Sequence, residues 1–185
     1  LLAGRSTYSD WLLKLLNDPD IRNSSGSFAD MIANVSVQLN NKNHLNAFAY
    51  GSNDRFKLAD ILEHKYHNLG ASVEWRHVFS NRSDIHFSLV HSTYGFDEKN
   101  NEYEFASYKQ SYTLDHDQFN VIYSLKVAKD HQIKLGGSST LYQVARGDYR
   151  PLSEQSAVIP VSFQPEKAIE SALFISDLWK INEKF

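Results

Sequence analysis

Histidine and carboxylate side chains are the residues of this 185-residue chain that first suggest chemistry, because such groups can coordinate a metal ion. His64 and His67 lie close together with Glu63 beside them, and Asp115-His116-Asp117 places a histidine between two carboxylates. A metal site needs several donors that converge at fixed spacing, and neither group has such a pattern. We therefore expect no metal site, place His64 and His67 in a loop, and interpret Asp115-His116-Asp117 as a solvated loop end at the entrance of a strand.

Patterns for nucleophilic catalysis and for nucleotide binding are also missing from the sequence. The chain has no cysteine and no Gly-x-Ser-x-Gly motif, and Gly136-Gly137-Ser138-Ser139 falls within a predicted strand. Neither the Gly-x-Gly-x-x-Gly spacing nor the Walker spacing occurs. The sequence therefore predicts neither an enzyme nor a bound cofactor.

The balance of charge argues against a polyanionic partner. The chain has 19 Lys and Arg residues against 22 Asp and Glu residues, which gives a net charge of −3. The basic residues form no stripe along the sequence. We therefore expect no nucleic-acid partner.

Any functional side chains must be positioned by β-strands, because apolar and polar residues alternate through long stretches. The clearest stretch is 117–141, where the odd positions are apolar from Phe119 to Val127 and polar residues take most even positions. A period of two predicts strands, and a polar turn near residue 130 predicts an antiparallel hairpin over about 112–143. The 10 Tyr and 11 Phe residues also favour strands.

The parity of this hairpin predicts its register. If the apolar residues of both strands share one face, odd residues lie opposite odd residues, across a turn of three or five residues. The expected pairs are Val127 with Ile133, Leu125 with Leu135, and Tyr123 with Gly137. The Tyr123 ring would then cover the glycine, and Lys126 would lie opposite Lys134 on the other face.

The same alternation recurs along the chain and predicts further elements. We expect hairpins over about 27–50 and 68–94, and one more strand over about 168–181 whose pairing partner would lie beyond the end of the chain. Ser9-Asp10 and the apolar residues that follow predict a capped helix of about two turns, which stops before Pro19.

The turns and loops differ in length in a regular way. Tight turns near residues 42, 82 and 130 alternate with long polar loops at 52–67, 95–110 and 145–167. All long loops should therefore lie at one end of the sheet, as in bacterial outer-membrane barrels, which have short periplasmic turns and long extracellular loops.

These observations predict an all-β fold. We expect an antiparallel up-and-down meander of seven or eight long strands that is part of a transmembrane β-barrel. No apolar run approaches the roughly 18 residues of a membrane-spanning helix. A soluble β-sandwich has the same alternation and stays open as an alternative.

The order of these segments resembles the middle of the β-barrel of TonB-dependent outer-membrane receptors, particularly those of Bacteroidetes-type bacteria. The likeness is carried by the segments from Gly4 to Leu13, from Asn17 to Phe28 and from Tyr50 to Leu58. A weaker likeness runs from Ala168 to Asp177.

The resemblance implies a barrel of about 22 strands, with a plug domain inside it and a periplasmic peptide that TonB grips. Such receptors bind scarce ligands and import them across the bacterial outer membrane, driven by the inner-membrane proton-motive force. Some work with a surface lipoprotein that covers the barrel. The chain begins Leu1-Leu2-Ala3 without a methionine, so we do not expect Leu1 to be the native start. The sequence shows no plug, no TonB-contacting peptide and no barrel-closing strand, so the resemblance implies that 1–185 is a partial β-barrel domain.

This interpretation assigns roles to side chains: odd-numbered rows face membrane lipid, and even-numbered rows line the lumen. The charged residues that would meet the plug are Glu74, Arg76, Lys126 and Lys134. The residues that would contact a ligand or partner from the outer loops are Trp11, Arg55, Tyr103 and Tyr149. Two other functions remain open, namely an outer-membrane barrel without TonB coupling, such as a porin or adhesin, and a soluble β-sandwich that binds a carbohydrate or another protein.

Overall fold

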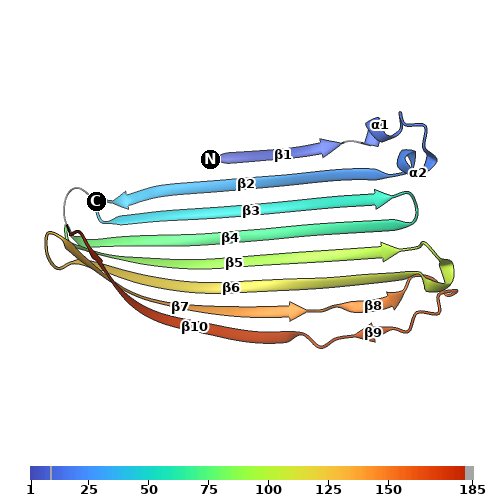
Figure 1. Ribbon diagram of the computed structural model, residues 1–185. Coiled ribbons are helices and arrows are strands. Elements are labelled where there is room, and N and C mark those ends of the chain that lie inside the picture. Colours follow the sequence, from blue (N-terminus) through green and yellow to red (C-terminus); the bar gives the residue numbers. More distant parts are fainter. Residues whose placement is uncertain (9, 182–185) are drawn as a thin grey trace.

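The chain forms one antiparallel sheet with short helical turns at one end (Figure 1). The computed structural model describes residues 1–8 and 10–181. The strands are β1 (Leu2–Tyr8), β2 (Ser25–Asn40), β3 (Asn43–Leu58), β4 (Leu62–Ser80), β5 (Ser83–Asn100), β6 (Tyr108–Lys126), β7 (His131–Ala145), β8 (Asp148–Pro151), β9 (Val161–Ser162) and β10 (Glu166–Trp179). The helical segments are α1 (Asp10–Leu13), α2 (Pro19–Arg22) and η1 (Glu104–Ala106). The predicted all-β class is confirmed.

The strands follow one another across the sheet in the order β1-β2-β3-β4-β5-β6-β7-β10, so the predicted up-and-down meander is also confirmed. The short strand β8 pairs with β6 beyond the end of β7, and β9 pairs with β8. β10 pairs with β7 from Glu166 to Trp179, so the expectation that its partner lies beyond the chain is wrong. Within the described residues β1 and β10 do not pair with each other, and the sheet is open.

The central hairpin has the predicted parity but a different register. Odd residues face odd residues, yet Leu125 lies opposite Ile133, Tyr123 opposite Leu135 and Val121 opposite Gly137. Val127 has left the sheet, because residues 127–130 form the turn. The expected pair Lys126 with Lys134 is therefore wrong, since Lys126 faces Gln132.

The glycines of β7 are covered from β10 and not by Tyr123. A Cβ built on Gly136 would lie 2.3 Å from the ring of Phe174, its register partner on β10. A Cβ on Gly137 would lie 2.8 Å from the Leu173 side chain. An aromatic ring over a glycine is thus present, but a different strand supplies it.

The largest error of the sequence prediction concerns residues 52–67, which form strands and not a loop. β3 continues to Leu58 and β4 begins at Leu62, with a tight turn at 59–61. The polar side chains there pair across strands, as Arg55 does with Glu63 at 2.6 Å, so this hairpin needs no apolar alternation. The hairpins accordingly span 25–58, 62–100 and 108–145, longer than predicted.

The two ends of the sheet differ as expected, with one exception. The turns at 41–42, 81–82 and 127–130 lie at one end, which we call the turn end, at the left of Figure 1. The segments 101–107 and 146–165 and the helices α1 and α2 lie at the other, which we call the loop end. The exception is the tight turn at 59–61, which also lies at the loop end.

The helical segments are shorter and more numerous than expected. α1 has one turn instead of two, and Ser9, expected to belong to its cap, lies outside the described residues. α2 follows because Pro19 fits the first position of a helix, where its missing N–H costs nothing. The Asp18 side chain caps α2 by accepting from the backbone N–H of Asp20 at 2.9 Å.

The sheet is a single layer. Within the described residues the buried apolar side chains are Ala59 and Phe96, and no second layer packs on either face. The helices among these residues are too short and too polar to cross a lipid bilayer. Apolar side chains that would form the core of a globular domain therefore lie exposed on the sheet surface.

Candidate functional site

The strand register divides the side chains into two faces. From β2 to β7 and on to β10 odd residues pair with odd residues, as Val73 does with Leu89 and Leu89 with Phe119. We call the side that carries these residues the odd face and the opposite side the even face. Arg150 of β8 also lies on the odd face, because it pairs with Lys109.

The central part of the odd face is an apolar band. Its side chains are half-buried or exposed, and the most exposed include Leu89 at 60%, Met31 at 60% and Leu69 at 54%. The band consists of Met31, Ala33, Val35, Val37, Leu45, Ala47, Ala49, Leu69, Ala71, Val73, Trp75, Phe79, Ile85, Phe87, Leu89, Phe119, Val121, Tyr123, Leu125, Ile133, Leu135, Leu141, Ile169, Leu173 and Ile175. Contiguous exposed apolar surface of this kind marks a contact with lipid or with another protein.

Aromatic rings gather at the edge of the band nearest the turn end. His77 packs edge-on against Phe79 with 4.7 Å between ring centroids, and Phe79 lies 6.2 Å from Tyr123. Asn43 accepts hydrogen bonds from Trp75 Nε1 at 3.1 Å and interacts with His77 Nδ1 at 2.8 Å. Trp75 and His77 thus direct ring nitrogens to Asn43 at the turn end, while the ring of Phe79 extends the apolar surface.

The four predicted lumen charges lie on the even face, which is polar in its half nearer the turn end. Arg76 donates from Nε and Nη2 to the Asp84 carboxylate at 3.3 and 3.2 Å. Glu74 lies 3.7 Å from the His86 ring. In the part of the chain that the structure describes, Lys126 and Lys134 form no ion pair. They face Gln132 and Ser124 across the β6–β7 ladder.

The four predicted outer-loop residues all lie toward the loop end, but on separate elements. Trp11 of α1 and Tyr103 beside η1 are 57% and 58% exposed. Tyr149 belongs to β8, where its ring lies 4.7 Å from Tyr108. Arg55 lies within β3 and not in a loop, and its Nε donates to Glu63 Oε1 at 2.7 Å.

Toward the loop end the two faces exchange their character. On the even face aromatic rings contact one another in a row, with 4.9 Å between Tyr66 and Phe96 and 4.9 Å between Phe96 and Tyr112. On the odd face the register row beside them is charged, with Arg55 opposite Lys65 and Lys65 opposite Asp97. This exchange was not predicted from the sequence, although the even numbering of Tyr66, Phe96 and Tyr112 was a visible signal.

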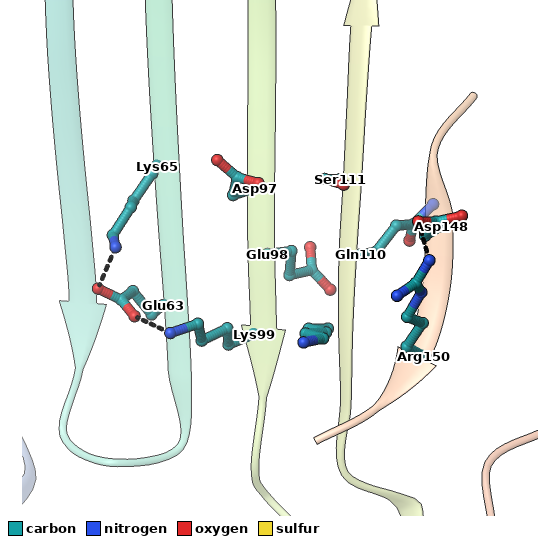
Figure 2. A pocket seen from close by; sticks show the side chains of 10 residues that line it. Glu63, Lys65, Asp97, Glu98, Lys99, Gln110, Ser111, Asp148 and Arg150 are labelled. Carbon is teal, nitrogen blue, oxygen red and sulfur yellow. Dashed lines mark hydrogen bonds and ion pairs between the residues drawn. The ribbon is translucent and has the colours of Figure 1, made fainter. Parts of the chain in front are cut away.

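The charged part of the odd face surrounds a pocket of about 390 Å³ (Figure 2). Glu63 is its central carboxylate, at 2.6 Å from Arg55, 3.5 Å from Lys65 and 3.7 Å from Lys99. Burial alone would raise the pKa of Glu63, but the hydrogen bond from Arg55 and the charges of Lys65 and Lys99 outweigh it and lower that pKa. Glu63 is therefore a fixed anion that holds three cations around it.

A second hydrogen bond at this end joins Tyr108 to Glu98. The Tyr108 hydroxyl donates to Glu98 Oε1 at 2.5 Å. This bond to the carboxylate, together with burial, raises the pKa of Tyr108 to about 12. The phenol therefore stays protonated and ties the end of β5 to the start of β6.

Neither metal ligands nor similar proteins give a further indication of the function. Within the described residues no three His, Asp or Glu side chains are grouped so that they could hold a metal ion. A comparison of the chain with protein-family models, with curated proteins and with solved structures found no match.

Proposed function

We propose that this chain forms part of the wall of an outer-membrane β-barrel, with its odd face toward lipid and its even face toward the lumen. The observation that carries the proposal is the apolar band on an uncovered face of a single-layer sheet. Exposed to water, such a band would promote aggregation, whereas the hydrocarbon of a membrane can cover its apolar side chains.

The height of the band supports a membrane-spanning position. On β4 it runs from Leu69 to Phe79, about 34 Å of strand at about 3.4 Å per residue. At the strand tilt of about 45° that is usual in barrels, this corresponds to about 24 Å across the membrane. Lipid-facing bands of outer-membrane barrels are about 25 Å tall.

The ends of the sheet support an orientation. In bacterial barrels short turns face the periplasm and longer connections face the outside, which assigns the turn end to the periplasm and the loop end to the exterior. The rings of Trp75, Phe79 and Tyr123 then lie at the periplasmic interface of the membrane, where aromatic side chains are enriched.

The free edges of the sheet imply neighbours. β1 and β10 expose unpaired backbone groups along their outer edges, and a membrane barrel tolerates no open edge. We propose that further strands of the same protein pair with both edges and close the barrel.

Within this proposal, active import of a scarce ligand by a TonB-dependent receptor is the specific function. The resemblance of the segments 4–13, 17–28 and 50–58 to that family supports it. Glu74, Arg76, Lys126 and Lys134 would then face a plug domain, and the loop end would receive the ligand or a surface lipoprotein. Loss of ligand uptake by cells that lack TonB tests this part, and uptake that is independent of TonB would favour a porin.

Cysteine scanning of the intact protein in lipid vesicles tests the barrel wall, because the chain has no native cysteine. Spin labels at Val73 and Leu89 should be reached by lipid-soluble oxygen, whereas labels at the adjacent even positions Ser72 and Ser88 should be reached by a water-soluble nickel reagent. Shielding of the odd positions from both reagents, in a protein that stays monomeric without detergent, would establish a soluble sandwich and exclude the barrel.

A further inference from the structure

Three cations lie side by side on the odd face at the loop end. The register places Lys99 of β5 opposite Lys109 of β6, and Lys109 opposite Arg150 of β8. Side chains directly opposite each other in an antiparallel pair have Cβ atoms about 5 Å apart, and like charges at such positions repel. Three neighbouring strands thus each place a positive charge at the same level.

Among the described residues, carboxylates pair with the two outer cations of this row but not with the central one. Glu63 lies 3.7 Å from Lys99 but is closer to Arg55 and Lys65, and Asp148 accepts from Arg150 at 2.5 Å. Asp97 lies opposite Lys65 and Ser111, one register row away from Lys99. Within residues 1–8 and 10–181 the Lys109 ammonium forms no ion pair, so the centre of the row carries an uncompensated charge.

The row opens into the pocket of Figure 2, whose other charged wall residues are Glu63, Lys65, Asp97, Glu98 and Asp148. The side chains of Lys99 and Arg150 are 49% and 55% exposed, so an anion can approach from solvent. A guanidinium offers paired N–H donors and each ammonium offers three, which together suit the oxygens of a phosphate group.

We propose that Lys99, Lys109 and Arg150 form a binding site for a phosphate group. The bound group can come from a phosphorylated glycolipid of the surrounding membrane or from a soluble phosphorylated compound. The site lies on the same face as the apolar band, ten residues beyond Leu89 along β5. The lipid source rests on the proposed function, which turns this face toward the membrane and its headgroups. The charge geometry of the row is independent of TonB coupling and of transport.

Thermal unfolding of the intact protein in a phosphate-free neutral detergent tests the site. Inorganic phosphate and lipid A, a phosphorylated glycolipid, are added separately, and dephosphorylated lipid A serves as the lipid control. We expect at least one phosphorylated probe to raise the melting temperature of the wild type. A shift with inorganic phosphate identifies a soluble source, and a shift with lipid A alone identifies a headgroup.

The variant Lys109→Gln gives the decisive comparison. Without phosphate it should melt higher than the wild type, because two like-charge contacts are relieved, and its affinity for the phosphorylated probe should fall about tenfold. Lys129→Gln, in the exposed turn 127–130 at the opposite end of the sheet, should change neither quantity. A wild type that no phosphorylated probe stabilises would overturn the proposal. So would a Lys109→Gln protein that melts lower without phosphate or keeps its affinity.

Discussion

Trp75 stacks on Phe87 of the neighbouring strand, with 5.6 Å between ring centroids and 13° between ring planes. The two residues are register partners of β4 and β5 on the odd face. Trp75 Nε1 donates to Asn43 Oδ1 at the turn end, so the indole joins the apolar band to a polar edge. This arrangement suits a side chain at the boundary between hydrocarbon and water.

Replacing Trp75 by alanine should lower the free energy of unfolding in lipid vesicles by about 1–2 kcal/mol, because the ring stacking and the hydrogen bond are both lost. Trp75→Phe keeps a ring against Phe87 and should lose less. Urea titration of vesicle-inserted protein measures both values. Trp11→Ala is the matched control, since Trp11 is exposed on α1, and an equal loss in both alanine variants would contradict the interfacial role.

A charge placed in the apolar band should destabilise the protein in a face-dependent manner. Val73→Arg points a guanidinium at hydrocarbon and should cost about 2–4 kcal/mol of unfolding free energy, whereas Ser72→Arg points it toward the lumen and should cost under about 1 kcal/mol. Equilibrium unfolding in vesicles compares the two variants. Equal costs for the two neighbouring positions would show that the odd face does not contact lipid.

Gly147 holds the chain in a conformation that no other residue can adopt there without movement. Its φ is +72°, and a Cβ on it would lie 1.3 Å from the Ser111 carbonyl oxygen. Gly147→Ala should therefore displace β8 and lower the unfolding free energy by about 2 kcal/mol or more. Because Arg150 moves with β8, the stabilisation by phosphate should disappear as well.

The control for this variant is Gly70→Ala, because a Cβ on Gly70 meets no atom within 4 Å. Its unfolding free energy should change by less than about 1 kcal/mol, and its response to phosphate should remain. If Gly147→Ala retains the phosphate response of the wild type, then the position of Arg150 does not depend on the backbone conformation at Gly147.

The Tyr108–Glu98 bond predicts behaviour at alkaline pH. The pKa of Tyr108 is raised from 10.0 to about 12 in the folded protein, so folding favours the protonated phenol. Its contribution to stability is complete below pH 10 and is lost as the pH rises through about 12. The tyrosinate absorbance of the wild type minus that of Tyr108→Phe should show one midpoint near pH 12. A midpoint near pH 10 would exclude the bond.

Alternation along the sequence was enough to predict the central parts of the long strands and their parity, because a period of two fixes which side chains share a face. It did not fix the register of β6 and β7, because Val127 continues the apolar row into the turn and gives no sign that the strand has ended. The hairpin around 59–61 was missed for a related reason. Arg55 and Glu63 support strand pairing through charge, which leaves no apolar period to detect.

The candidate sites were less predictable than the fold. Glu74 and Arg76 could be assigned to the even face from β4 alone, because one strand determines their side. The row of Lys99, Lys109 and Arg150 joins three strands whose register depends on turn lengths, and β8 has no apolar pattern of its own. Contacts that depend on long-range register cannot be found from local periodicity.

The hairpin that joins β3 to β4, and the continuation of β5 to Asn100, extend paired backbone well past the apolar band toward the loop end. Side chains such as Arg55, Tyr66 and Phe96 are therefore carried on a hydrogen-bonded ladder and are already ordered before any partner arrives. When a molecule docks at this end, the protein therefore loses little chain entropy. Recognition then depends on how well that molecule matches a rigid surface.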